Sequence, residues 1–175
     1  MAFLRTALTV ALVITALLLE LTVLSVFHLP GATPDVLTVT VVALGLVGGP
    51  VRGAATGLAA GLALDLVTPA DGVIGITAVV LVVVGYLAGL LGGGTDRSPF
   101  VTVALAGLLT GGATLAYALI GGLVADPRIA WDRVPGLVLT QTAYAVVLAA
   151  FVVPGVAWLW RRVDPPAPRY EVGRR

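Results

Sequence analysis

Three polar side chains lie inside otherwise hydrophobic runs, and they are the residues of this sequence best placed to do chemistry. Glu20 and Asp65 each interrupt an apolar stretch, and Gln141 lies in a third. A charge at the centre of a bilayer costs roughly 2.5–3.5 kcal/mol on insertion scales, so each needs a reason. Asp65 follows Arg52 by 13 residues and Glu20 follows Arg5 by 15. At the helical rise this is about 20 Å of a core about 30 Å thick, which predicts a polar zone in the outer half of a membrane bundle.

Two interpretations of this polar zone remain open. In the structural one, Asp65 caps or closes its helix end and Glu20 hydrogen-bonds a neighbouring helix. In the functional one, the zone is a pocket or a partner-contact site open to the outer face. No basic residue is expected at matching depth. We therefore hypothesise that one or both acids are protonated, which a carbonyl-stretch titration would test.

Residues for catalysis, metal binding or cofactor binding are scarce. His28 is the only histidine and is expected in a loop, and cysteine is absent. These counts exclude a histidine-rich metal site, thiolate ligands and a cysteine nucleophile. The run Gly92-Gly93-Gly94 lacks the lysine of a phosphate-binding loop. Asp65 and Asp71 form only a weak candidate for paired carboxylates, so we expect no enzyme, no metal and no cofactor.

The composition is that of an all-α membrane protein. Of 175 residues, 59% are hydrophobic and 11% charged, with a mean hydropathy of +1.08. Soluble domains contain about 25% charged residues. The net charge of +1 suggests neither nucleic acid nor an acidic substrate as a partner, and membrane lipid is the expected surroundings.

Proline, glycine and charged residues divide the chain into six apolar runs. The first run is too long for the core of a signal peptide and has no A-x-A-like cleavage site, so we expect a retained helix. We predict one transmembrane domain over 1–162 and a disordered cytoplasmic tail over 163–175. The six expected spans cover residues 4–27, 34–48, 53–67, 73–91, 99–124 and 135–160.

The second and third runs are shorter than the roughly 20 residues of a usual span, so they could instead form a re-entrant hairpin. Such a hairpin would place Arg52 deep in the membrane. With six spans and both termini cytoplasmic, the arginines at 5, 52, 97, 161 and 162 and those of the tail fall inside. Only Arg128 and Arg133 fall outside. This agrees with the positive-inside rule. We therefore predict a six-transmembrane-helix bundle in a cell membrane.

Aromatic residues mark both predicted interfaces. Trp158 and Trp160 precede Arg161 and Arg162, as in an aromatic belt at the cytoplasmic side. Trp131 would play the same part outside. The loop that contains it, with Arg128 and Arg133, is a candidate extracytoplasmic contact loop.

Glycine spacing predicts close helix packing. Gly53, Gly57 and Gly61 recur every four residues, and Gly85 and Gly89 repeat the spacing. Such a stripe lets another backbone approach closely. It fits packing within the chain, and alternatively the docking of a partner's helix.

The string from residue 34 to residue 89 combines several short motifs. It begins Pro34-Asp35-Val36-Leu37 and continues from Arg52 as R-G-A-A-T-G-L-A-A-G-L-A-L-D-L, which ends at Leu66. A turn leads to Gly72-Val73-Ile74-Gly75 and then to Gly85-Tyr86-Leu87-Ala88-Gly89. This string resembles the bacterial rod shape-determining protein MreD family. The family positions matched are Pro34, Asp35, Gly57, Gly61, Asp65 and Gly75.

The resemblance implies a non-enzymatic scaffold of the elongasome, the machinery of side-wall peptidoglycan synthesis and cell-shape control. The implied partners are MreC directly and, through the complex, MreB, RodA and a class B penicillin-binding protein. The rival interpretation is the substrate-binding S component of an energy-coupling factor vitamin transporter, which is also a six-helix protein. Aromatic residues are only 6% of the chain, which argues against a vitamin site.

Overall fold

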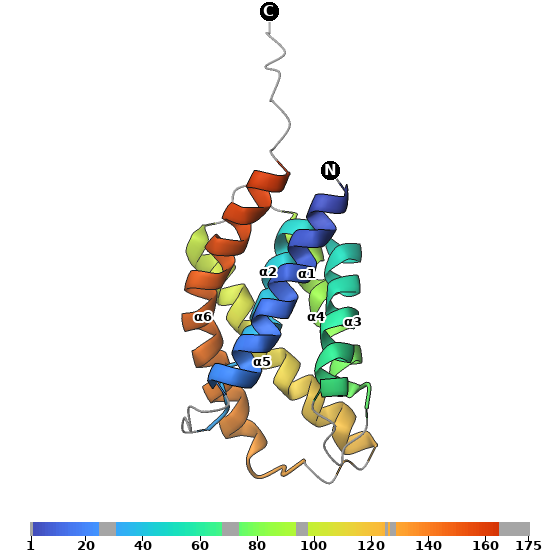
Figure 1. Cartoon of the computed structure of the whole chain (residues 1–175). Coiled ribbons are helices and arrows are strands. Elements are labelled where there is room, and N and C mark those ends of the chain that lie inside the picture. Colours follow the sequence, from blue (N-terminus) through green and yellow to red (C-terminus); the bar gives the residue numbers. More distant parts are fainter. Residues whose placement is uncertain are drawn as a thin grey trace, which may run out of the picture.

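The computed structural model describes residues 2–24, 31–67, 74–93, 98–124, 126 and 129–164. In these ranges the chain forms six α-helices and no strand, arranged as a bundle of alternating direction (Figure 1). A π-helical turn, η1, extends the first helix over Glu20–Leu24. The helices are α1 (Ala2–Leu19), α2 (Val36–Gly48), α3 (Pro50–Val67), α4 (Ile76–Gly92), α5 (Pro99–Leu123) and α6 (Val134–Val163).

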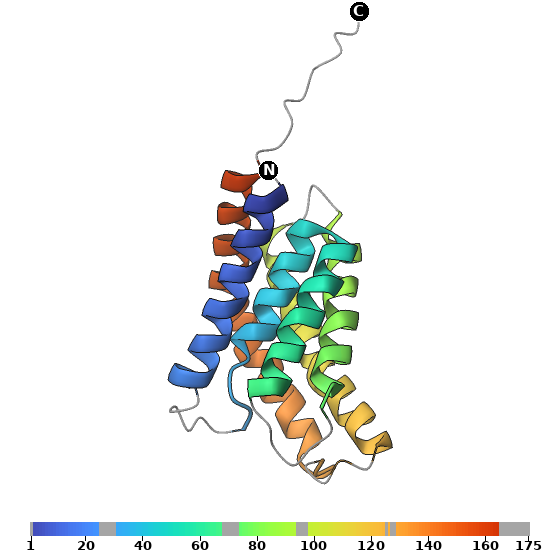
Figure 2. The ribbon, with the colours of Figure 1, turned by 45° about the vertical axis from the view of Figure 1, so that its right-hand side comes forward.

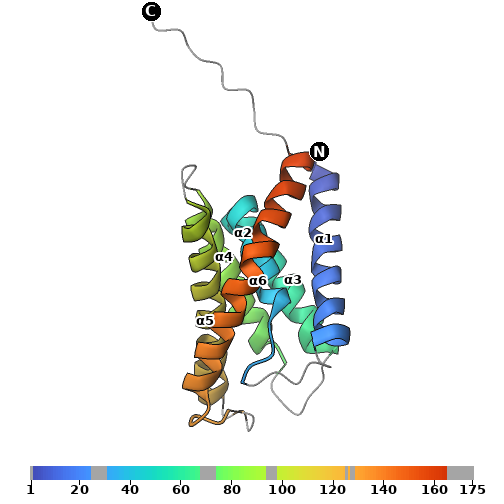
Figure 3. The same cartoon turned by 90° about the vertical axis from the view of Figure 1, so that its left-hand side faces the viewer.

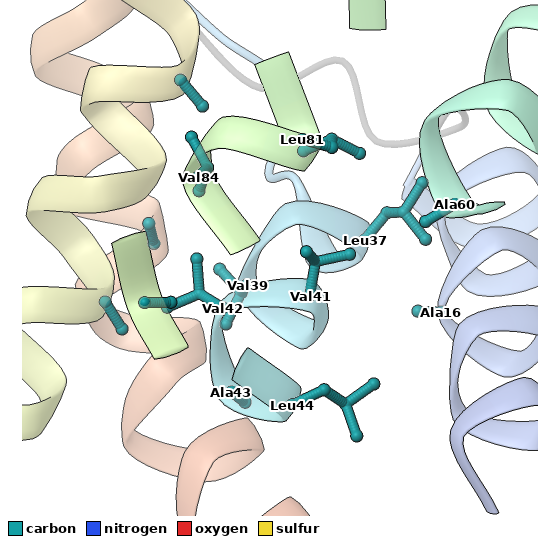
Figure 4. Packing of buried hydrophobic residues seen from close by; sticks show 14 of the residues in the cluster. Ala16, Leu37, Val39, Val41, Val42, Ala43, Leu44, Ala60, Leu81 and Val84 are labelled. Carbon is teal, nitrogen blue, oxygen red and sulfur yellow. The ribbon is translucent and has the colours of Figure 1, made fainter. Parts of the chain in front are cut away.

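Helix α2 is the centre of the bundle. Every residue from Leu37 to Gly45 is buried, and α2 contacts each of the other five helices. Figure 4 shows its side chains between those of α4, α3 and α1. A helix that is apolar all round is buried all round. Because its neighbours cover it, α2 need not match the length of a lipid-exposed span.

Glycines join α3 to α4. An added Cβ at Gly57 would overlap the backbone at Leu81, and one at Gly61 would overlap the backbone at Ala78. Gly53 lies equally close to Gly85. The stripe is therefore used for packing within the chain, which is the first of the two interpretations.

Apolar side chains cover much of the bundle's exterior. Phe100, Leu108 and Phe151 are exposed by 86%, 65% and 76%. Three helical stretches are long and apolar enough to cross a membrane, namely Phe3–Thr22, Pro99–Leu123 and Val134–Val163. Large exposed apolar patches mark membrane or protein contact surfaces.

Several helix ends differ from the prediction. Helix α3 begins at Pro50 rather than at residue 53, because Gly49, with φ of 86°, ends α2 and proline is well suited to a first helical position. Helix α4 begins at Ile76, three residues later than predicted, and α2 begins at Val36, after the Asp35 cap.

Helix α6 runs to Val163, past the predicted end at residue 160. Arginines are favourable in the last turn of a helix, and Arg161 and Arg162 occupy it. The predicted tail was therefore wrong at its start, since Val163 is helical and Asp164 caps the helix. Its remainder, and residues 25–27 of the first predicted span, lie outside the described residues.

The two ends of the bundle differ in chemistry. The start of α1 and the end of α6 lie together at one end, here called the terminal end (Figures 2 and 3). Arg5 and Arg162 lie there. The first turns of α2, α4 and α6 lie at the opposite end, here called the loop end. The predicted polar residues lie toward the loop end.

Candidate functional site

Two acidic residues accept hydrogen bonds from backbone N–H groups at the start of α2. Oε2 of Glu20 accepts a hydrogen bond from the backbone N–H of Leu37 at 2.9 Å. Asp35 is the N-cap, and its carboxylate accepts from the N–H of Thr38 at 2.6 Å and from the Thr38 hydroxyl at 2.5 Å. The first N–H groups of a helix lack intrahelical partners and carry partial positive charge. Both acids therefore meet donors that α2 leaves open.

Asp65 plays the same part for α4. Its Oδ2 accepts from the N–H of Gly75 at 2.9 Å and from the N–H of Ala78 at 3.3 Å. Gly75 is the N-cap of α4 and has a φ of 104°, a conformation that favours glycine. The structural interpretation expected Asp65 to serve its own helix end. The structure instead has it bind the start of the next helix.

The carboxyl groups of Glu20 and Asp35 lie close to each other at the start of α2, where they bind adjacent residues. Two ionised carboxylates in contact repel each other, so we hypothesise that the pair carries one proton. Glu20 is the first residue of the π-helical turn that extends α1; such turns are frequent at functional sites. The two acids therefore join the end of α1 to the start of α2.

A cavity of about 370 Å³ lies among these groups. Gln141 of α6 lines it and is only 4% exposed. An amide offers both donors and an acceptor, whereas an ionised carboxylate only accepts. The cavity wall thus offers groups of both kinds to a ligand. Its polar lining includes Glu20, Asp35, Asp65, Thr114, Tyr117 and Gln141.

A second cavity of about 690 Å³ adjoins the first, because Thr114 and Tyr117 line both. Asp132 and Arg133 contribute charge to its wall. Arg133, a predicted contact-loop residue, thus lies beside the polar zone. Sequence spacing gave no sign of this neighbourhood, which depends on how α5 and α6 pack.

The other predicted residues are distributed around this end. Trp131 is 54% exposed and its ring lies against Gly122. Arg128 lies outside the described residues. Pro34 is buried beside the Asp35 cap. At the terminal end, Trp158 is half exposed but Trp160 is only 7% exposed, so the predicted placement of Trp160 at a lipid-facing belt is wrong.

The contact between Asp35 and Glu20 was missed. Asp35 before an apolar run, with Thr38 three residues later, is a recognisable helix-start pattern. That pattern predicts the cap but not the second carboxyl, which arrives from α1. Within the described ranges, no three side chains of the usual ligand types are grouped for a metal ion. His28 and Asp71 lie outside those ranges.

The fold and the apolar exterior indicate an all-helical bundle that associates with a membrane. No protein-family model, curated protein or solved structure matches the chain. Any narrower assignment therefore depends on the residues themselves.

Proposed function

We propose that this protein is a non-enzymatic membrane scaffold of the MreD type, which binds an MreC-like partner and supports side-wall peptidoglycan synthesis. The proposal is based on contacts among residues of the 34–89 string, which resembles that family. Asp65 binds the N–H of Gly75, Gly57 and Gly61 pack on α4, and Asp35 caps α2. Residues up to 40 positions apart in the sequence thus hold one end of the bundle.

The proposal includes six membrane crossings with both termini in the cytoplasm. Arg5, Arg52, Arg161 and Arg162 all belong to the terminal end, which supports a cytoplasmic location for that end. The shortness of α2 is no objection, because other helices cover it. The proposed location is the bacterial cell membrane.

The loop end is the proposed contact surface for the extracytoplasmic part of MreC. Trp131 is exposed there beside Arg133, and aromatic and arginine residues dominate many interfaces. MreB, RodA and a class B penicillin-binding protein would join through the complex.

A detergent pull-down with tagged MreC tests this proposal. We expect near-stoichiometric recovery with the wild-type chain and at least about tenfold weaker binding for Trp131→Ala combined with Arg133→Gln. Phe100→Ala, an exposed change on another helix end, is the matched control. Equal recovery of all three would contradict the proposed surface, and no recovery of the wild type would contradict the proposed function.

The two adjoining cavities favour a second candidate, a substrate-binding S component of a vitamin transporter. Their volumes of about 370 and 690 Å³ fall within the range of small-molecule sites, about 300–1,000 Å³. Purified protein that retains a vitamin at nanomolar affinity would favour this candidate over the scaffold.

A further inference from the structure

A groove of about 280 Å³ at the terminal end lies apart from the polar zone. It is lined by residues of α1 and α3 and by Trp160 in the last turns of α6. Its wall contains two arginines, three threonines, and small and apolar residues. The residues that matter here are Arg5, Thr9, Arg52, Thr56, Ala59 and Trp160.

The Arg5 guanidinium has N–H donors in this groove that its partner Asp164 does not use. One terminal nitrogen binds the Asp164 carboxylate, in a pair that is 24% and 30% exposed. The Nε atom is buried and has no hydrogen-bond partner among the described residues. A guanidinium carries five N–H donors in a fixed fork, which suits a phosphate group. The guanidinium therefore has N–H donors that the Asp164 carboxylate does not use.

Arg52 supplies the second positive charge. Its guanidinium carbon lies 5.8 Å from the ring centroid of Trp160, which is 7% exposed. This contact with the aromatic face orients the guanidinium at the groove. Asp164 neutralises one of the two arginines, so the groove retains about one positive charge, the complement of one phosphodiester.

The inner wall of the groove offers a hydroxyl and then an apolar surface. Thr56 lines the groove and is 7% exposed. Beyond it lie Ala59 of α3 and Val10 of α1, and Leu62 continues the exposed face of α3. A ligand with a charged head and an apolar tail fits this order of residues.

We propose that this groove binds one anionic phospholipid, with its phosphate between Arg5 and Arg52 and an acyl chain along α1 and α3. Basic pockets between transmembrane helices on the cytoplasmic side hold anionic headgroups in this way. The proposal rests on the membrane location of the bundle but not on MreC binding. Lipid binding is measured on the purified chain alone, so the two proposals can fail independently.

Native mass spectrometry of the full chain, with phosphatidylglycerol and phosphatidylcholine in equal amounts, tests the groove. We expect one phosphatidylglycerol to be retained, with at least about tenfold preference over phosphatidylcholine. Arg52→Gln should abolish the preference. Asp164→Asn should strengthen it, because Arg5 then has no competing carboxylate. Arg162→Gln, whose guanidinium lies over Trp158 at 4.2 Å, is the matched control and should keep the preference.

Arg5→Gln also breaks the pair with Asp164, so Thr56→Val serves as a variant that leaves the arginines intact. It should weaken retention while the thermal unfolding of the lipid-free chain stays unchanged. Equal retention of both lipids by the wild type, or equal loss in Arg162→Gln, would overturn the proposal. Inorganic phosphate alone should not stabilise the protein. If it protects as well as the lipid does, the groove is a site for a soluble anion instead.

Discussion

The acidic residues inside the apolar runs share one structural task. Glu20 and Asp65 each accept backbone N–H groups at the start of a helix to which they do not belong, α2 and α4 respectively. An unpaired N–H in an apolar setting costs about 1–3 kcal/mol. The carboxyl groups are tolerated at this depth because they remove that cost.

Replacing Glu20 tests its role as a cap. Glu20→Ala leaves the N–H of Leu37 without its acceptor and should lower the free energy of unfolding by about 1–3 kcal/mol. Glu20→Gln keeps an acceptor for Leu37 and a donor for Asp35, so it should cost less than about 1 kcal/mol. Reversible unfolding in mixed detergent measures both, with Thr15→Ala on the exposed side of α1 as the control. Equal losses for Ala and Gln would contradict the cap.

A proton on the Glu20–Asp35 pair has a spectroscopic signature that tests the hypothesis. The infrared spectrum should contain the carbonyl-stretch band of a protonated carboxyl group, and Glu20→Gln should remove or shift it. Asp65→Asn, which changes a carboxylate bonded to two N–H groups, should leave the band in place. A wild-type spectrum with no such band would contradict the pairing of Glu20 with Asp35.

The depth and the partners of these acidic residues could be predicted only in part from the sequence. Helical rise from the nearest arginine predicted that Glu20 and Asp65 lie at similar depth. One of the two interpretations, the structural one, expected Glu20 to hydrogen-bond a neighbouring helix. The pairing of Glu20 with Asp35 could not be predicted, because it depends on how α1 turns against α2 through the π-helical segment.

At the scale of elements, α3 and α4 are the helices that pack most closely. Backbone meets backbone at Gly57 and Gly61, so neither neighbour can move aside as a flexible side chain would. The spacing of four residues predicted this stripe, since it repeats on one helix face. Which helix it meets was not predictable, because any small-residue face would serve.

A methyl group at the contact should separate the two helices. Gly57→Ala places a Cβ against the backbone at Leu81, and overpacking of this kind costs roughly 1–3 kcal/mol or more. Gly112→Ala in α5 adds its methyl group in open space and is the matched control. It should change the free energy of unfolding by less than about 1 kcal/mol. The same detergent unfolding assay compares them, and equal effects would contradict the packing account.

Element ends were predicted less well than element number. The Gly49-Pro50 pair was interpreted as a stop, yet Gly49 ends α2 while Pro50 opens α3 directly. Arg161 and Arg162 were placed after the last span, whose predicted end was residue 160, although they form the last turn of α6. In both cases one residue type suits the end of a helix and the beginning of another structure, and composition alone does not separate the two.

At the scale of the whole molecule, the two ends of the bundle have opposite chemistry. The loop end gathers carboxyl groups over two cavities, and the terminal end gathers arginines around a groove. The central helix α2 lies between the two ends and is covered by the other five helices. This polarity is the basis of the proposed six crossings, of the MreC surface and of the lipid site.

The side of the membrane on which each end lies is the most direct test of the account. The chain contains no cysteine, so single cysteines at Thr33, Ile74, Ser98 and Arg162 can be labelled in intact cells with a membrane-impermeant maleimide. The account predicts labelling at residues 33 and 74, and protection at 98 and 162 until the cells are opened. Labelling of residues 74 and 162 from the same side would contradict six crossings.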